Sequence, residues 1–130
     1  MPGYPGNDLA NLLRSNQQAF LWNNENAAAG ALSAAVQLER ISHSSYPWGV
    51  AFDVQFSGAP GAFEIDIVGA QDDVGYPNPG QYVVLGTITA VNSSNCGRWD
   101  MPSNMWPKFV AAILKTLTNS AVNTTLRVTR

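Results

Sequence analysis

Apolar side chains at every second position from residue 46 to residue 56 constrain the fold of this chain more than any other feature. They are Tyr46, Trp48, Val50, Phe52, Val54 and Phe56, and the residues between them are small or polar. Successive side chains of a β-strand lie on opposite faces of a sheet, so this spacing puts four aromatic rings and two valines on one face. A second layer must cover such a face, which predicts a small two-layered β protein.

The same alternation recurs along the chain, with turn-forming residues between the alternating segments. We expect strands over residues 32–38, 46–56, 63–68, 81–91, 109–117 and 122–128. The last two are joined by a short turn at Asn119 and Ser120, which predicts an antiparallel hairpin. Because no strand–helix–strand rhythm is present, the pattern favours an all-β antiparallel β-sandwich of jelly-roll type, with an open barrel as the alternative.

The N-terminal segment lacks this alternation. Its first residues are rich in Pro and Gly, which disfavour regular structure. Asp8 is placed to cap a short helix with leucines at helical spacing, namely Leu9, Leu12 and Leu13. We therefore expect an N-terminal arm with a short helix over residues 1–26 and one β-sandwich domain over residues 27–130.

The composition narrows the classes of partner. Charged residues make up 12% of the 130 residues, about half the usual share, and the net charge is −2. No run of Lys or Arg offers the basic patch that nucleic-acid binding needs. No apolar stretch is long enough to span a membrane, and the N-terminus lacks the layout of a secretory signal. We expect a protein that is made in a cytoplasm and meets other proteins, with no nucleic-acid or membrane partner.

Two groups of residues could support an enzyme. His43 is the only histidine and has serines beside it, but the partners of a catalytic triad normally come from separate parts of a fold. Glu64 and Asp66 share one face of a strand, a spacing that a glycosidase could use and that a solvated strand face also produces. In each case the interpretation without a catalytic role is favoured, and we expect no catalytic residue.

Metal and cofactor sites are equally weakly indicated. Asp72 and Asp73 lie in a loop that offers oxygen ligands without the regular spacing of a calcium loop. Cys96 is the only cysteine, which excludes an internal disulfide and a cysteine-pair metal site. We expect neither a bound metal nor a cofactor.

Tryptophans are the strongest candidates for binding. Trp99 follows Arg98 in a polar loop expected over residues 92–104, and Trp106 follows that loop. Aromatic rings on loops can stack on sugars or anchor a protein interface, and they can also plug the end of a sandwich. We select Trp22, Arg98, Trp99 and Trp106 as candidate protein-interface residues.

The last two thirds of the chain resemble small virion proteins of tailed bacteriophages. The resemblance rests on the stretches 63–68, 82–86 and 97–110, on Leu117–Thr118–Asn119 and on the closing strand. It implies a non-enzymatic capsid decoration (cement) protein, assembled into a virion in the host cytoplasm. The implied partners are the major capsid protein or other virion proteins, and further copies of this chain in a dimer or trimer. A neck or tail component and a carbohydrate-binding β-sandwich module are the alternatives.

Overall fold

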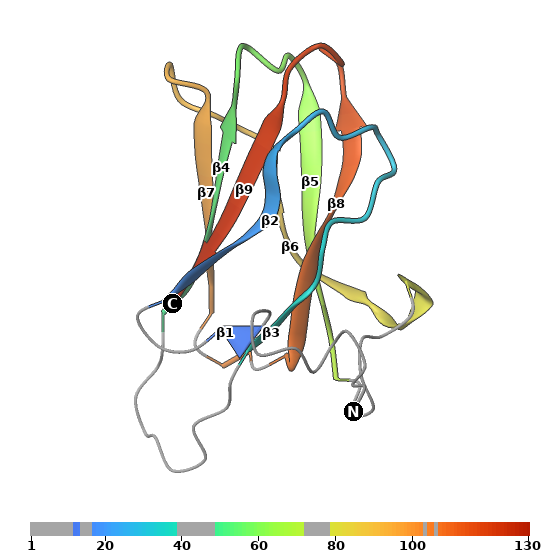
Figure 1. Ribbon diagram of the computed structural model, residues 1–130, viewed down its shortest axis with the longest axis vertical. Coiled ribbons are helices and arrows are strands. Elements are labelled where there is room, and N and C mark those ends of the chain that lie inside the picture. Colours follow the sequence, from blue (N-terminus) through green and yellow to red (C-terminus); the bar gives the residue numbers. More distant parts are fainter. Residues whose placement is uncertain (1–11, 14–16, 39–48, 72–78, 103, 106) are drawn as a thin grey trace.

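The computed structural model describes residues 12–13, 17–38, 49–71, 79–102, 104–105 and 107–130. Two β-sheets face each other in a sandwich (Figure 1). The strands are β1 (Leu12–Leu13), β2 (Gln18–Glu25), β3 (Val36–Leu38), β4 (Val50–Phe56), β5 (Phe63–Ala70), β6 (Val83–Ile88), β7 (Cys96–Met101), β8 (Phe109–Leu117) and β9 (Thr124–Thr129). A 3₁₀ turn, η3 (Pro79–Gln81), precedes β6.

The strand order is that of a jelly roll. One sheet runs β1-β3-β8-β5-β6 and the other runs β2-β9-β4-β7. If β2 to β9 are counted as eight successive strands, the orders read 2-7-4-5 and 1-8-3-6, the two interlocked Greek keys of that fold. All pairs are antiparallel except the short parallel contact of β1 with β3. The expected all-β antiparallel sandwich is confirmed.

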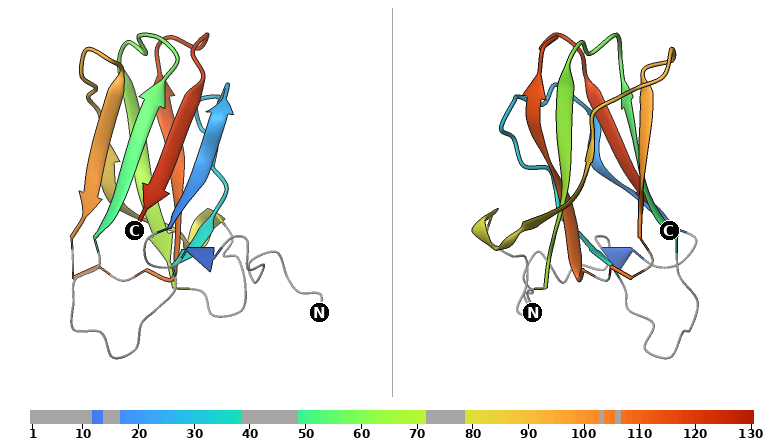
Figure 2. Two further views of the ribbon diagram at one scale, coloured as in Figure 1. Left: turned by 60° about the vertical axis from the view of Figure 1, so that its left-hand side comes forward. Right: turned by 180° about the vertical axis from the view of Figure 1, so that it is seen from behind.

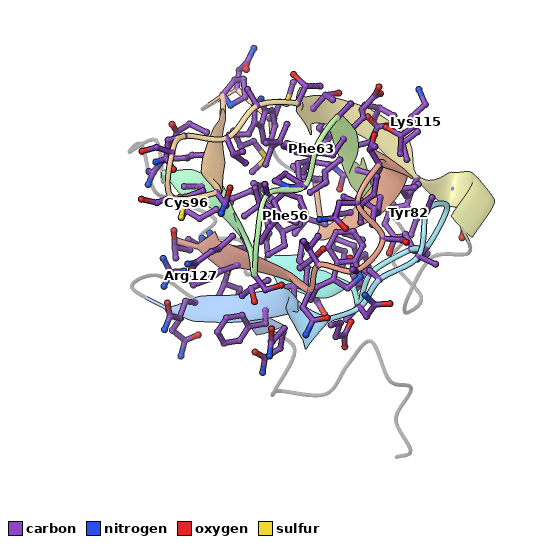
Figure 3. All side chains as sticks on the ribbon, turned by 90° about the horizontal axis from the view of Figure 1, so that it is seen from above. Phe56, Phe63, Tyr82, Cys96, Lys115 and Arg127 are labelled. Atoms are coloured by element: carbon purple, nitrogen blue, oxygen red, sulfur yellow. The ribbon has the colours of Figure 1, made fainter. Side chains whose placement is uncertain are left out.

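The core lies between the two sheets, and β4 supplies much of it. Val50, Phe52, Val54 and Phe56 are each at most 2% exposed, so the predicted apolar face is the buried one. Tyr46 and Trp48, the first two members of that pattern, lie outside the described residues. The Phe56 ring meets the Phe63 ring of β5 edge-on, with centroids 4.8 Å apart. Seen from above, the two phenylalanines lie between the sheets, while Cys96 and Arg127 mark one outer side and Lys115 the other (Figure 3).

The predicted hairpin of the last two strands is wrong. β8 pairs with β3 and β5, whereas β9 pairs with β2 and β4 in the opposite sheet. The turn between them is tied to the β4–β5 connection instead, because the Asn119 amide donates to the Ala59 carbonyl at 2.8 Å. Figure 2 shows both connections crossing the same end of the sandwich. A short turn brings two strands close, but it does not decide which sheet each one joins.

The sandwich includes residues that precede the expected boundary at residue 27. Residues 18–25 form β2, which pairs with the central strand β9, so the sandwich includes part of the predicted arm. Leu12 and Leu13 form a strand rather than helix, while Asp8 and Leu9 lie outside the described residues. Register shifts on both sides of Trp22 place it and the adjacent Leu21 in the core at 3% and 2% exposure. Such irregularities remove the period-two pattern by which a strand is recognised.

The expected polar loop over residues 92–104 contains β7. Gly97, Trp99 and Met101 face the sandwich interior, and the residues between them face outward. The preceding turn is organised by Asn92, whose side-chain oxygen accepts hydrogen bonds from the Ser94 and Cys96 amides at 2.9 and 3.1 Å. Charged residues on the outward positions of this edge strand make it look like a loop in sequence.

Candidate docking surfaces

The outer face of the sheet β2-β9-β4-β7 carries a row of four side chains, which we call the charged row. Phe20, Arg127, Asp53 and Arg98 are successive register partners on β2, β9, β4 and β7. The Asp53 carboxylate lies between two guanidinium groups, 3.5 Å from Arg98 Nη1 and 3.9 Å from Arg127 Nη2. Antiparallel pairing therefore converts residues far apart in sequence into one alternating charge pattern.

Arg98, a predicted interface residue, is held firmly in this row. Its Nε donates to Asp100 Oδ1 at 3.0 Å, and Nη2 lies 2.9 Å from the same oxygen. The hydrogen bond to Asp100 raises the pKa of Arg98, and the charges of Asp53 and Asp100 add to this effect. Because all these groups are in contact with solvent, the pairs contribute little to stability. Their geometry fixes an alternating charge pattern on this outer face.

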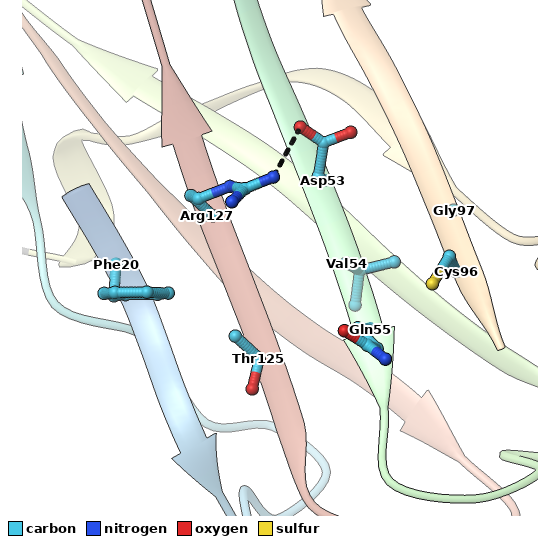
Figure 4. A pocket seen from close by; sticks show the side chains of 8 residues that line it. All are labelled: Phe20, Asp53, Val54, Gln55, Cys96, Gly97, Thr125 and Arg127. Carbon is cyan, nitrogen blue, oxygen red and sulfur yellow. Dashed lines mark ion pairs between the residues drawn. The ribbon is translucent and has the colours of Figure 1, made fainter. Parts of the chain in front are cut away.

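A shallow pocket lies on the same outer face (Figure 4). Its volume is about 340 Å³. Its lining consists of Phe20, Asp53, Val54, Gln55, Cys96, Gly97, Thr125 and Arg127. Phe20 is 44% exposed and supplies the aromatic side of the pocket, while Gln55 and Thr125 supply uncharged hydrogen-bonding groups. This mixture suits a small polar ligand or the side chains of a protein partner.

The second surface is the edge strand β6. In the described part of the chain, β6 pairs with β5 and with no other strand. Val83 and Val84 are 62% and 59% exposed, and we call them the edge valines. Figures 1 and 2 show this end of β6 extending away from the body of the sandwich. Consecutive exposed valines on an open edge are unusual, since edges are normally guarded by charges or prolines.

A hollow continues this surface on the inner side of β6. Its volume is also about 340 Å³. The lining residues are Gly69, Ala70, Gln71, Gln81, Val83, Leu85 and Pro107. No charged side chain is among these described lining residues, so the described part of the hollow and the edge valines form one uncharged region.

The four predicted interface residues lie in different environments. Trp22 is a core residue, whereas Arg98 is exposed. Trp99 is half-buried, with its ring 5.7 Å from the Phe52 ring and packed directly over Gly86 of β6, so it fills the gap between the two sheets. Trp106 lies outside the described residues. The sequence analysis missed Phe20 and the edge valines.

The candidate catalytic carboxylates have structural partners. Glu64 lies 3.2 Å from Lys115 Nζ, and Asp66 is 8% exposed and accepts a hydrogen bond from the Thr87 hydroxyl at 3.1 Å. His43, Asp72 and Asp73 lie outside the described residues. Within the described ranges, no group of three or more His, Cys, Asp or Glu side chains could hold a metal ion.

Comparisons with protein-family models, with curated protein sequences and with solved structures return no match to this chain. Among the residues that the structure describes, no helix is long and apolar enough to cross a bilayer.

Proposed function

We propose that this chain is a non-enzymatic virion structural protein, most specifically a bacteriophage capsid decoration (cement) protein that self-associates and stabilises the major capsid shell. The observation that carries the proposal is the uncharged edge strand with its two exposed valines, at 62% and 59%. A surface of this kind is made to be covered by protein. A neck or tail component would use the same surface, and the experiment below separates the two positions.

The fold supports this role. Jelly rolls occur in viral capsid proteins as well as in lectins. The low charge of the chain, 12% of residues, lowers the cost of removing water from a large contact area. Attachment in many copies adds avidity, so each contact can be weak.

Particles of the virus that encodes the chain provide the test. We expect quantitative mass spectrometry to find many copies per particle, and shells assembled without the protein to bind it and to withstand higher temperature afterwards. Antibody labelling that is confined to the neck or tail would assign the alternative position. Particles that contain no copy of the chain would overturn the proposal.

The N-terminal arm expected over residues 1–26 is proposed here as the part that reaches a neighbouring subunit, and its test needs a shorter deletion than that boundary suggests. Removing residues 1–20 would take away Leu13, which is 2% exposed, and the start of β2. Removing residues 1–11 leaves every described strand intact. We expect this shorter deletion to weaken binding to shells at an unchanged unfolding temperature, and unchanged binding would refute a role for the arm.

The pocket of Figure 4 favours carbohydrate binding as a second candidate function. Phe20 offers a partly exposed ring beside the polar groups of Asp53, Gln55 and Arg127, a combination that suits a sugar. A glycan array probed with the purified chain tests this candidate. A hit that disappears in Phe20→Ala and persists in Leu32→Ala, which alters another exposed apolar residue, would support it, and an array without hits would reject it.

A further inference from the structure

The free edge of β6 is the least protected edge in the described part of the sandwich. β6 uses one side to pair with β5, which leaves the backbone groups of its other side facing outward. On the opposite sheet, the edge strand β7 carries Arg98 and Asp100, and the edge of β2 is contacted by Ala34, whose amide donates to the Leu21 carbonyl at 3.3 Å. β6 has neither charges nor such a contact in the described residues.

Both faces of β6 are apolar at its open end. Val84 is the register partner of Val68, so it lies on the outer face of the sheet. Val83 lines the hollow on the inner side together with Leu85. A strand added to this edge would therefore cover apolar surface on both sides while pairing with the free backbone groups.

The charge distribution favours a second copy of this chain as the source of a strand added to the β6 edge. Residues 74–97 contain no Asp, Glu, Lys or Arg. In an antiparallel pair across a twofold axis, residues near the axis meet the same residues of the other copy, so any charge there would face a like charge. The absence of charge over this whole segment removes that penalty for self-pairing and offers no attraction to a charged partner strand.

We propose that β6 pairs antiparallel with β6 of a second copy, which joins the two five-stranded sheets into one continuous sheet across a twofold axis. This inference rests on the proposed function in its expectation of self-association, and it names the surface involved. Six residues of strand span about 20 Å, which is short for an interface. We therefore expect a weak dimer with micromolar affinity, which attachment in many copies would reinforce.

The first test is sedimentation velocity of the full chain from about 1 µM to about 300 µM, a range that brackets micromolar dissociation constants. We expect a monomer that converts into a dimer as the concentration rises. In Val84→Lys each copy brings a new positive charge into the same short paired segment, and dimerisation should weaken at least tenfold. The control Leu32→Lys puts the same charge on another exposed apolar residue, 38% exposed, and should dimerise like the unmodified chain.

A mixing experiment separates a symmetric pair from simple loss of apolar surface. Val84→Lys and Val84→Glu should each be monomeric, and an equimolar mixture should restore a dimer that contains one copy of each. Thermal unfolding of both variants should match the unmodified chain, because an exposed side chain is replaced in each.

The outcomes distinguish this inference from the proposed function. A chain that stays monomeric at the highest concentration, or a dimer that Val84→Lys leaves intact, overturns the pairing. Capture of a strand from another virion protein at β6, with no self-association, overturns it as well and leaves the virion role standing. A β6-dependent dimer in solution, formed by a chain of which particles contain no copy, would overturn the virion role alone.

Discussion

The contact between Gly86 and Trp99 provides the sharpest test of the packing at the open edge. Gly86 lies in the middle of β6, and the Trp99 indole of β7 packs directly on it. A Cβ atom added at Gly86 would come closer than 3.0 Å to Cε2, Cζ2 and Nε1 of that indole, which real Cβ atoms essentially never do. Gly86→Ala must therefore displace a ring that also packs against Phe52.

The size of the effect follows from two opposing contributions. Overpacking of this kind costs about 1–3 kcal/mol. Replacing a strand glycine by alanine increases the free energy of unfolding by about 0.5–1 kcal/mol, because glycine loses more conformational freedom on folding. We expect a net loss of about 1–2 kcal/mol in the free energy of unfolding. For a chain of 130 residues this lowers the unfolding temperature by about 4–7 °C.

Urea unfolding followed by far-ultraviolet circular dichroism measures this loss without relying on tryptophan fluorescence. Gly49→Ala is the matched control, because a Cβ at Gly49 meets no atom within 4 Å, and it should leave stability nearly unchanged. The same Gly86→Ala change in a Trp99→Leu background should be neutral or slightly stabilising. The resulting double-mutant cycle should give a coupling energy of at least about 1 kcal/mol.

Two results would refute this reasoning. Gly86→Ala with the stability and denaturant slope of the unmodified chain would show that the indole does not rest on β6. An equal loss in the presence and absence of Trp99 would assign the cost to the backbone of β6 instead.

Four further substitutions test other features of the sandwich. Ser33→Ala removes the hydroxyl that accepts a hydrogen bond from the buried Ala112 amide at 2.8 Å, and urea unfolding should show a loss of about 1–3 kcal/mol, which Ser33→Thr should largely restore. Thr124→Val removes a fully buried hydroxyl without a hydrogen-bond partner among the described residues, so stability should rise by about 1 kcal/mol, and a fall would reveal a partner. Gly30→Ala tests backbone strain alone, because φ is +90° and no atom lies within 4 Å of a new Cβ, and calorimetry should show a loss of about 1–2 kcal/mol. Arg98→Ala should leave the unfolding temperature within experimental error, since its ion pairs are exposed, and a clear drop would show that the charged row supports the fold.

The alternation of apolar residues was sufficient to predict which faces of several strands are buried. In β9 the pattern places Thr124 on the same face as Leu126 and Val128, and all three are 0% exposed. In β5 it predicts the buried side at Ile65 and Ile67 correctly. The opposite side of β5 was expected to be mostly polar and solvated, yet Val68 and Asp66 on that side are 1% and 8% exposed.

Strands with irregular register or exposed charges escaped prediction. Register shifts in β2 place Leu21 and Trp22 in the core although they are consecutive in sequence. In β7, the charged residues Arg98 and Asp100 make the strand resemble a polar loop. The choice of sheet for β8 and β9 also escaped, because it depends on pairing between distant segments. The alternation predicts which face of a strand is buried, but it does not predict which strand will pair with it.

The candidate site was predictable only in part. Arg98 is exposed as expected, because a charged residue on an edge strand rarely has a buried position available. The exposure of the edge valines depends on β6 having no second neighbour, which the alternation does not report. The signal that could have found them is the absence of charge over residues 74–97, a property that becomes informative once the edge position of β6 is known.

The position of β9 has a consequence for how the protein is made. β9 (Thr124–Thr129) lies between β2 and β4, so the described strand that is synthesised after all the others occupies the middle of its sheet. Before β9 is synthesised, β2 and β4 lack the strand that pairs with both of them. That strand lies about a hundred residues downstream of β2. Folding of this sandwich is therefore expected to be completed only after β9 has left the ribosome, and a nascent chain that lacks β9 should still be sensitive to protease.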